Sequence, residues 1–115
     1  MTTKECYEAL GGSYPEALSR FRDDARIRRF AKMFLSDGSW QELLQAMEQK
    51  DTGTAFRAAH TLKGVCQNLS FTRLYAVSSR MTELLRNEDL PAAAQCLPEL
   101  TNAYRDTVGA LTQME

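Results

Sequence analysis

The chain has 115 residues, of which 43% are hydrophobic and 25% are charged, and its formal net charge is −1. This length supports one modest hydrophobic core, so we expect a single domain over residues 1–115. The nearly balanced charge does not favour nucleic-acid binding, and no apolar run approaches the roughly 20 residues that a membrane-spanning helix needs.

The N-terminal part predicts short helices within about residues 1–21. Thr2-x-x-Glu5 and Ser13-x-x-Glu16 both have the form of a capping box, which satisfies free backbone N–H groups at the start of a helix. The Gly11-Gly12 pair between them predicts a turn.

From about residue 22 to residue 113, apolar side chains recur at the i, i+3, i+4, i+7 spacing of amphipathic helices. They predict helices near 23–35, 39–49, 52–69, 71–87 and 90–113, the last one either kinked or split at Pro98. The connections are short, which favours antiparallel neighbours. The expected fold is therefore all-α, an antiparallel four-helix bundle with additional N-terminal and C-terminal helices. We expect the first four of these helices to form much of the bundle, with 90–113 packing alongside.

Capping residues also mark the starts of two helices in this region. Ser39-x-x-Glu42 has the form of a third capping box, and Asp51 stands directly before the 52–69 helix. Both positions predict where the chain enters a helix.

The 52–69 helix contains the only histidine, His60, and an interior glycine, Gly64. An interior glycine costs a helix roughly 0.8–1 kcal/mol relative to alanine, and neither flanking sequence indicates that the helix ends there. Glycine lets another molecule or backbone come close without a side chain in the way. The cost is explained if a partner must approach the surface beside His60.

Helical spacing separates two faces of this segment. The centre of the apolar stripe, which includes Ala58 and Leu62, lies nearly opposite His60, so His60 is predicted to face solvent. The face of His60 also carries the following residues: Gly53, Phe56, Arg57, Lys63, Gly64 and Gln67.

The side chains around His60 fit an acceptor of a phosphoryl group. A neutral imidazole nitrogen can attack phosphorus near neutral pH. Lys63, one turn later, is placed to reach phosphoryl oxygens, and Arg57, one turn earlier, adds positive potential. Phe56 is interpreted either as an apolar docking contact or as a ring packed under a neighbouring helix. The alternative for the whole face is an ordinary solvated surface, with Gly64 serving helix packing.

The segment Ala59-His60-Thr61-Leu62-Lys63-Gly64 closely resembles the histidine-containing phosphotransfer (HPt) domain family, whose phosphorylated helix carries H-x-L-K-G. The resemblance covers roughly residues 20–112. It implies that His60 is phosphorylated, that Lys63 stabilises the phosphoryl group and that Gly64 gives clearance for a receiver domain. The chain departs from many relatives at Ser70, where they have glycine, and at Cys66 and Gln67, where they have small residues; the roles of Gln67 and Ser70 stay open.

The resemblance further implies a phosphocarrier in a two-component phosphorelay. His60 would accept a phosphoryl group from a receiver-domain aspartate, on a response regulator or a hybrid histidine kinase, and pass it to another receiver. Such a carrier is not an enzyme and needs no cofactor or metal of its own, because the receiver supplies the aspartyl phosphate and Mg²⁺. The alternative is an HPt-like docking module that binds receivers or other signalling proteins without being phosphorylated. A metal-dependent or hydrolytic enzyme has little support, because the chain offers one histidine and no ligand cluster.

Cysteine usage indicates a reducing compartment. The chain has three cysteines, an odd number, with neither disulfide nor zinc-ligand spacing: Cys6, Cys66 and Cys96. We interpret them as small core residues. The start of the chain lacks the pattern of a secretory signal. We expect a cytoplasmic protein, monomeric by default, and the Met1 start favours a stand-alone protein over a domain of a longer kinase.

Overall fold

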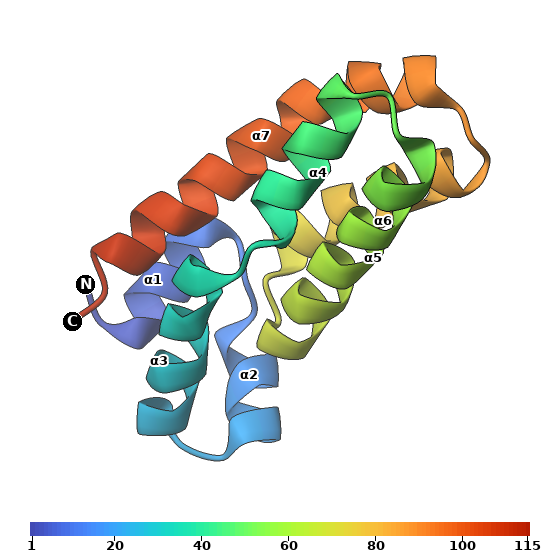
Figure 1. Ribbon diagram of the computed structural model, residues 1–115. Helices are drawn as coiled ribbons and strands as arrows, with labels where there is room; N and C mark the ends of the chain where they lie inside the picture. The colour runs from blue at the N-terminus through green and yellow to red at the C-terminus, as the bar shows by residue number, and fades with distance from the viewer.

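The computed structural model describes residues 1–115 and contains α-helices and no strands, so the prediction of an all-α fold is confirmed (Figure 1). A short 3₁₀ helix, η1, links α3 to α4. The elements in chain order are α1 (Thr3–Leu10), α2 (Tyr14–Phe21), α3 (Asp24–Met33), η1 (Phe34–Ser36), α4 (Ser39–Glu48), α5 (Thr52–Leu69), α6 (Thr72–Arg86) and α7 (Leu90–Thr112).

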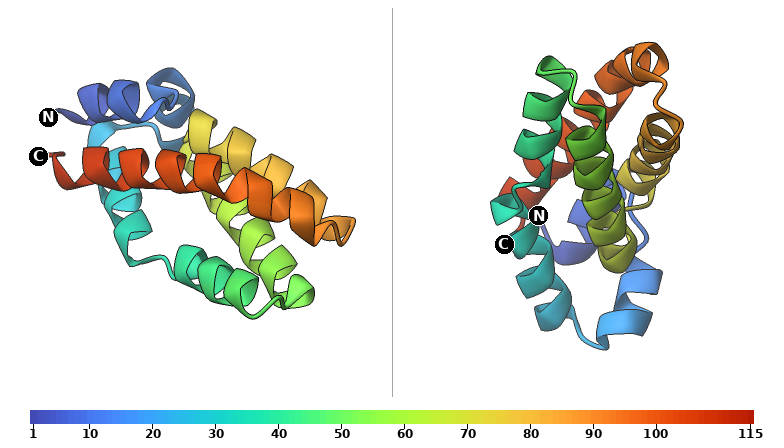
Figure 2. Two further views of the ribbon diagram at one scale, coloured as in Figure 1. Left: turned by 90° about the horizontal axis from the view of Figure 1, so that it is seen from above. Right: turned by 45° about the vertical axis from the view of Figure 1, so that its right-hand side comes forward.

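The four-helix bundle consists of α4, α5, α6 and α7, in which consecutive helices are antiparallel neighbours (Figures 1 and 2). The long α7 joins α4 through Trp40 and Tyr104, whose rings stack with their centroids 4.4 Å apart. The expectation that residues 23–35 belong to the bundle while 90–113 packs alongside is therefore wrong. The apolar stripe of α3 is short, and α3 packs mainly against α2, with smaller contacts to α1 and α5, at one end of the molecule.

Helix boundaries follow the sequence signals closely, with one exception. The side chains of Thr2, Ser13 and Asp51 accept hydrogen bonds from backbone N–H groups of the helices that follow them, as expected. Ser39 is not a cap, because the carboxylate of Asp37 accepts its backbone N–H at 2.9 Å and the helix begins at Ser39 itself. The last helix is continuous through Pro98 rather than split, so this proline is accommodated inside α7.

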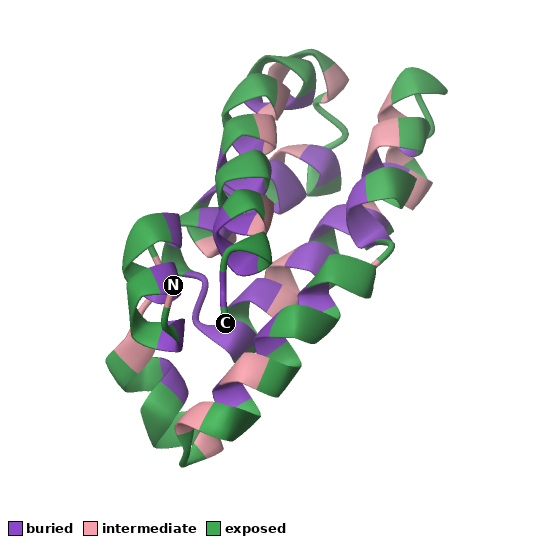
Figure 3. Cartoon of the chain, turned by 90° about the vertical axis from the view of Figure 1, so that its left-hand side faces the viewer, coloured by how far each residue is buried: buried purple, intermediate pink, exposed green.

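Buried residues lie on the helix faces that turn toward the interior, and exposed residues lie on the outer faces (Figure 3). All three cysteines are buried and free, in agreement with their interpretation as core residues. Burial raises the pKa of the Cys66 thiol to about 12. None of the helices combines the length and the apolar composition that a membrane-spanning segment requires.

The turn between α1 and α2 packs against the turn between α5 and α6. The hydroxyl of Tyr7 donates a hydrogen bond to the carbonyl oxygen of Leu69 at 2.8 Å, and Ser13 N–H donates to the carbonyl oxygen of Ser70 at 2.9 Å. Gly12 is required by this close approach, because a Cβ atom there would lie 2.9 Å from the Ser70 carbonyl oxygen. These contacts place the N-terminal helices at the C-terminal end of α5.

The two ends of the chain lie side by side (Figure 1). The N-terminal amino group of Met1 donates to the carbonyl oxygen of Gln113 at 2.7 Å, and Glu115 N–H donates to the carbonyl oxygen of Met1 at 2.9 Å. This pairing accompanies the packing of α1 along α7.

Candidate functional site

The site is built on α5, which begins at a well-formed cap. Both carboxylate oxygens of Asp51 accept hydrogen bonds from Thr54, one from its hydroxyl at 2.7 Å and one from its backbone N–H at 3.2 Å. These bonds lower the pKa of Asp51 from its usual value. The apolar stripe of α5 is buried against α4 and α6, except at half-buried Val65. The orientation of α5 about its own axis is therefore fixed.

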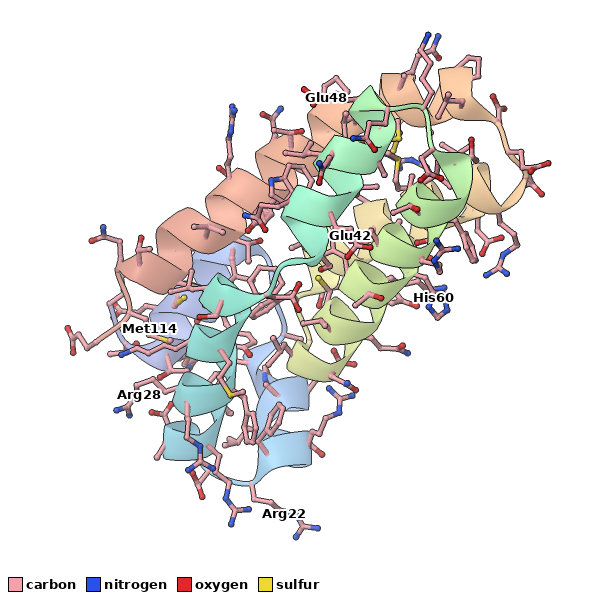
Figure 4. All side chains as sticks on the ribbon, in the orientation of Figure 1. Arg22, Arg28, Glu42, Glu48, His60 and Met114 are labelled. Atoms are coloured by element: carbon pink, nitrogen blue, oxygen red, sulfur yellow. The ribbon has the colours of Figure 1, made fainter.

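His60 is exposed on the outer face of α5, as the helical spacing predicts (Figure 4). Its imidazole lies beside the ring of Phe56, one turn earlier, with centroids 5.9 Å apart and an angle of 39° between the planes. The guanidinium carbon of Arg86, at the end of α6, lies 4.9 Å from the centroid of the Phe56 ring. Phe56 is half-buried between these two side chains. The neighbouring α6 thus contributes a cation that the sequence did not reveal.

Two further cations flank His60 along α5. Arg57 is exposed, and its guanidinium donates to the hydroxyl of Thr54 at 3.2 Å. Lys63 is half-buried, and neither Lys63 nor Arg57 takes part in any of the ion pairs of the structure. Neither charge is therefore held by a carboxylate in an ion pair of the structure.

The surface at Gly64, one turn after His60, faces open space. A Cβ atom built on Gly64 would meet no atom within 4 Å, so nothing inside the protein requires glycine at this position. The alternative that Gly64 serves helix packing is not supported. Gln67 is exposed one turn further on and extends the same face.

The C-terminal end of α5 is held by a residue that the sequence analysis did not single out, Arg20 of α2. Its guanidinium Nη1 donates to the carbonyl oxygens of Gln67 and Asn68, at 3.1 and 2.7 Å, and to the hydroxyl of Ser70 at 3.0 Å. Ser70 ends α5 in the left-handed region, with φ 58° and ψ 38°. No local pattern could reveal these contacts, since they join residues about 50 positions apart.

An apolar groove of about 820 Å³ lies between α2, α3 and the C-terminal half of α5. The rings of Phe21 and Phe30 stack at its wall with centroids 5.2 Å apart, and the side chain of Met33, 60% exposed, stands at its edge. Val65 and Asn68 line it from α5. The helix that carries His60 therefore also forms one wall of this groove.

The model of the Hpt domain family matches residues 16–110, a span that begins in α2 and includes nearly all of α7. The chain belongs to the Hpt domain family. The matched span of this Hpt domain contains the whole of α5 with His60, Lys63 and Gly64, and the helices that hold it. Comparisons of the chain with curated proteins and with solved structures give no match. No group of three or more histidine, cysteine, aspartate or glutamate side chains in the Hpt domain is arranged to hold a metal ion.

Proposed function

We propose that this Hpt domain is a phosphocarrier in a two-component phosphorelay. His60 accepts a phosphoryl group from an aspartate of a receiver domain and passes it to another receiver. One observation carries the proposal: His60 is exposed on α5, with Arg57 and Lys63 three residues before and after it, and a Cβ atom on Gly64 would meet no atom within 4 Å. The family supports this assignment, since histidine phosphotransfer is the activity for which Hpt domains are named.

The proposed reaction needs little from the carrier beyond position and charge. A nitrogen lone pair of His60 attacks the phosphorus of the aspartyl phosphate, the P–N bond forms, and the bond from phosphorus to the aspartate oxygen breaks and leaves a carboxylate. Charge on the phosphoryl oxygens is neutralised by Lys63 and Arg57, and by the Mg²⁺ that the receiver brings. The same steps in reverse load the next receiver.

The surroundings of His60 suit a receiver domain as partner. Gly64 gives clearance where the active site of the receiver must close on the imidazole, and Gln67 lies at the rim of that contact. In this proposal the docked receiver extends from His60 along α5 to the apolar groove, which has Met33 at its edge. In this proposal the Hpt domain works in the cytoplasm as a monomer that exchanges receivers, including the receiver of a hybrid histidine kinase.

The test is phosphoryl transfer from a panel of phosphorylated receiver domains to the wild-type protein and to His60→Gln. A label that is stable in alkali, labile in acid and present on the wild type alone would support the proposal. Met33→Glu should weaken binding of the productive receiver, whereas Leu18→Glu is its matched control, because Leu18 is 38% exposed but lies outside the groove.

A docking module without phosphorylation would give a different result in this experiment. Receivers would bind the wild type and His60→Gln equally well, and neither protein would acquire a label. That outcome would overturn the carrier proposal while leaving the family assignment intact.

A further inference from the structure

Phe56 forms a wall on one side of the His60 imidazole, and Arg86 covers Phe56 from the neighbouring helix. The three side chains make a row in which the guanidinium, the phenyl ring and the imidazole follow one another. The separations are 4.9 Å from the guanidinium carbon to the phenyl centroid and 5.9 Å between the ring centroids.

Arg86 is held in this row from two sides. Its Nε lies 3.3 Å from Oε1 of Glu83, one turn earlier on α6, and its guanidinium lies over the face of the Phe56 ring. An arginine over an aromatic face is attracted by the negative potential of the ring. Since Phe56 is half-buried and packs against the hydrophobic core, its own position is anchored by α5 and the core.

An exposed histidine on a helix samples several side-chain rotamers, and a phosphoryl donor requires only the one that aims a nitrogen at the phosphorus. A fixed ring beside the imidazole removes part of this freedom before the partner arrives. Such orientation of reacting groups accelerates a reaction, and a displacement of about 1 Å can cost as much as about 100-fold in rate.

We infer that Phe56 and Arg86 are positioning residues that orient the imidazole of His60 for transfer from a docked receiver, with Arg86 acting through Phe56. This inference rests on the proposed function, because it assigns the row a part in the same reaction. It makes α6 a contributor to the reactivity of a histidine on α5. It also explains why Phe56 carries an arginine over its ring instead of facing solvent alone.

Two phosphoryl donors distinguish an effect on the orientation of the His60 imidazole from an effect of the charge beside it. The first is the phosphorylated receiver that transfers fastest to the wild type. The second is phosphoramidate, a small donor that approaches from any direction: the imidazole nitrogen bonds to its phosphorus, the P–N bond of the donor breaks, and ammonia leaves. We expect Phe56→Leu to lower the transfer rate at saturating receiver by about tenfold. The half-saturating receiver concentration and the rate with phosphoramidate should change by less than twofold.

The arginine is tested in the same assay. Arg86→Gln should lower the receiver-dependent rate in the same direction as Phe56→Leu, and Arg86→Lys should recover part of it, because lysine also binds an aromatic face. The matched control is Arg80→Gln, which removes an exposed, ion-paired arginine of α6 that has no aromatic partner. It should leave both rates unchanged.

The imidazole gives an independent readout. His60 is the only histidine, so its ring signals in proton NMR need no assignment. Its ring protons should move toward the positions of free histidine in Phe56→Leu, and by a smaller amount in Arg86→Gln.

Equal receiver-dependent rates in the wild type, Phe56→Leu and Arg86→Gln would overturn the inference while leaving the proposed function standing. A parallel loss of the phosphoramidate rate would also overturn it, because the row would then act through charge and not through orientation. A wild-type protein that accepts no phosphoryl group from any receiver would overturn both the inference and the proposed function.

Discussion

Nη1 of Arg20 lies 3.0 Å from Oγ of Ser70, so a side chain of α2 is hydrogen-bonded to the residue that ends α5. Ser70 lies in the left-handed region, which costs a residue with a Cβ atom about 1–2 kcal/mol. The hydrogen bonds from Arg20 to Ser70 and to the last carbonyl oxygens of α5 offset that cost. They also place a positive charge at the negative end of the helix dipole.

Replacing Ser70 with alanine should lower the free energy of unfolding by about 1 kcal/mol, because the backbone stays left-handed while the hydroxyl contact to Arg20 is lost. Ser70→Gly should remain closer to the wild type, since glycine adopts this conformation without strain. Urea denaturation measures both. The cost of Ser70→Ala should shrink in an Arg20→Met background. An alanine variant as stable as the glycine variant would contradict the argument.

Gly64→Ala should raise the free energy of unfolding by about 0.5–1 kcal/mol, because alanine favours an interior helical position and the added Cβ atom meets nothing. Gly109→Ala is the matched control, since Gly109 lies inside α7 and its added Cβ atom is equally free. Thermal denaturation should show the same gain for both variants.

A larger side chain should affect the rate of phosphoryl transfer at Gly64 but not at Gly109. Gly64→Gln should slow transfer from a receiver by about tenfold or more, because its side chain fills the space into which the partner must close. Gly109→Gln should transfer at the wild-type rate. Full transfer by Gly64→Gln would show that the clearance is not needed.

Lys63→Ala should slow transfer, or shorten the lifetime of the phosphorylated histidine, by about tenfold, since it removes the cation one turn from His60. The effect should be partial because Arg57 remains. Lys63→Arg should restore most of the activity, and Lys50→Ala, an exposed lysine outside the His60 face, should have no effect. An unchanged transfer rate and an unchanged lifetime in Lys63→Ala would contradict a role of Lys63 in stabilising the phosphoryl group.

The hydrogen bonds of Asp24 predict that the free energy of unfolding depends on pH. Its carboxylate accepts hydrogen bonds from the hydroxyl of Tyr14 at 2.6 Å, the guanidinium of Arg28 at 2.8 Å and the hydroxyl of Thr3 at 3.2 Å. The bond from Tyr14, followed by that from Arg28, lowers the pKa of Asp24 from its usual value. A lowered pKa in the folded state adds stability above about pH 4, and this stability is lost as the pH falls through the lowered pKa.

The Asp24→Asn variant should therefore be less stable than the wild type at pH 7 and should lose less stability between pH 5 and pH 2. The difference should be modest, because the Asp24 side chain is 43% exposed and solvent screens the interaction. Urea denaturation at several pH values measures it. Parallel pH profiles for the two proteins would show that Asp24 does not carry the effect.

The sequence allowed the bundle helices and the faces of α5 to be predicted because their signals are local. Asp51, the apolar stripe and the uninterrupted flanks of Gly64 are enough to define α5 over the expected residues. The exposure of His60 follows from the same spacing. The helix also ends at residue 69 as expected, and Ser70 ends it through a left-handed backbone conformation that the sequence does not specify.

Long-range contacts were not predictable in this way. Nothing near Arg20 indicates that it binds the end of a helix 50 residues later, and nothing near Arg86 indicates that it covers Phe56. The membership of the bundle was also predicted wrongly, since an apolar stripe reveals that a helix is buried but not which helix buries it. Ser39 is not a cap because the helix begins at Ser39 itself, and its backbone N–H and its hydroxyl both donate to the carboxylate of Asp37.

Because the two ends of the chain are in contact, the same fold could form with its helices in a different order along the chain. Since Met1 and Gln113 are already in contact, a short linker could join the ends, and the chain could be reopened at the exposed turn between α6 and α7, near Glu88. Such a circular permutant would begin with α7 and end with α6, and would keep α5 and its surface unbroken. In this architecture the position of the helix that carries His60 would depend on its neighbours in space and not on the order in which they are made.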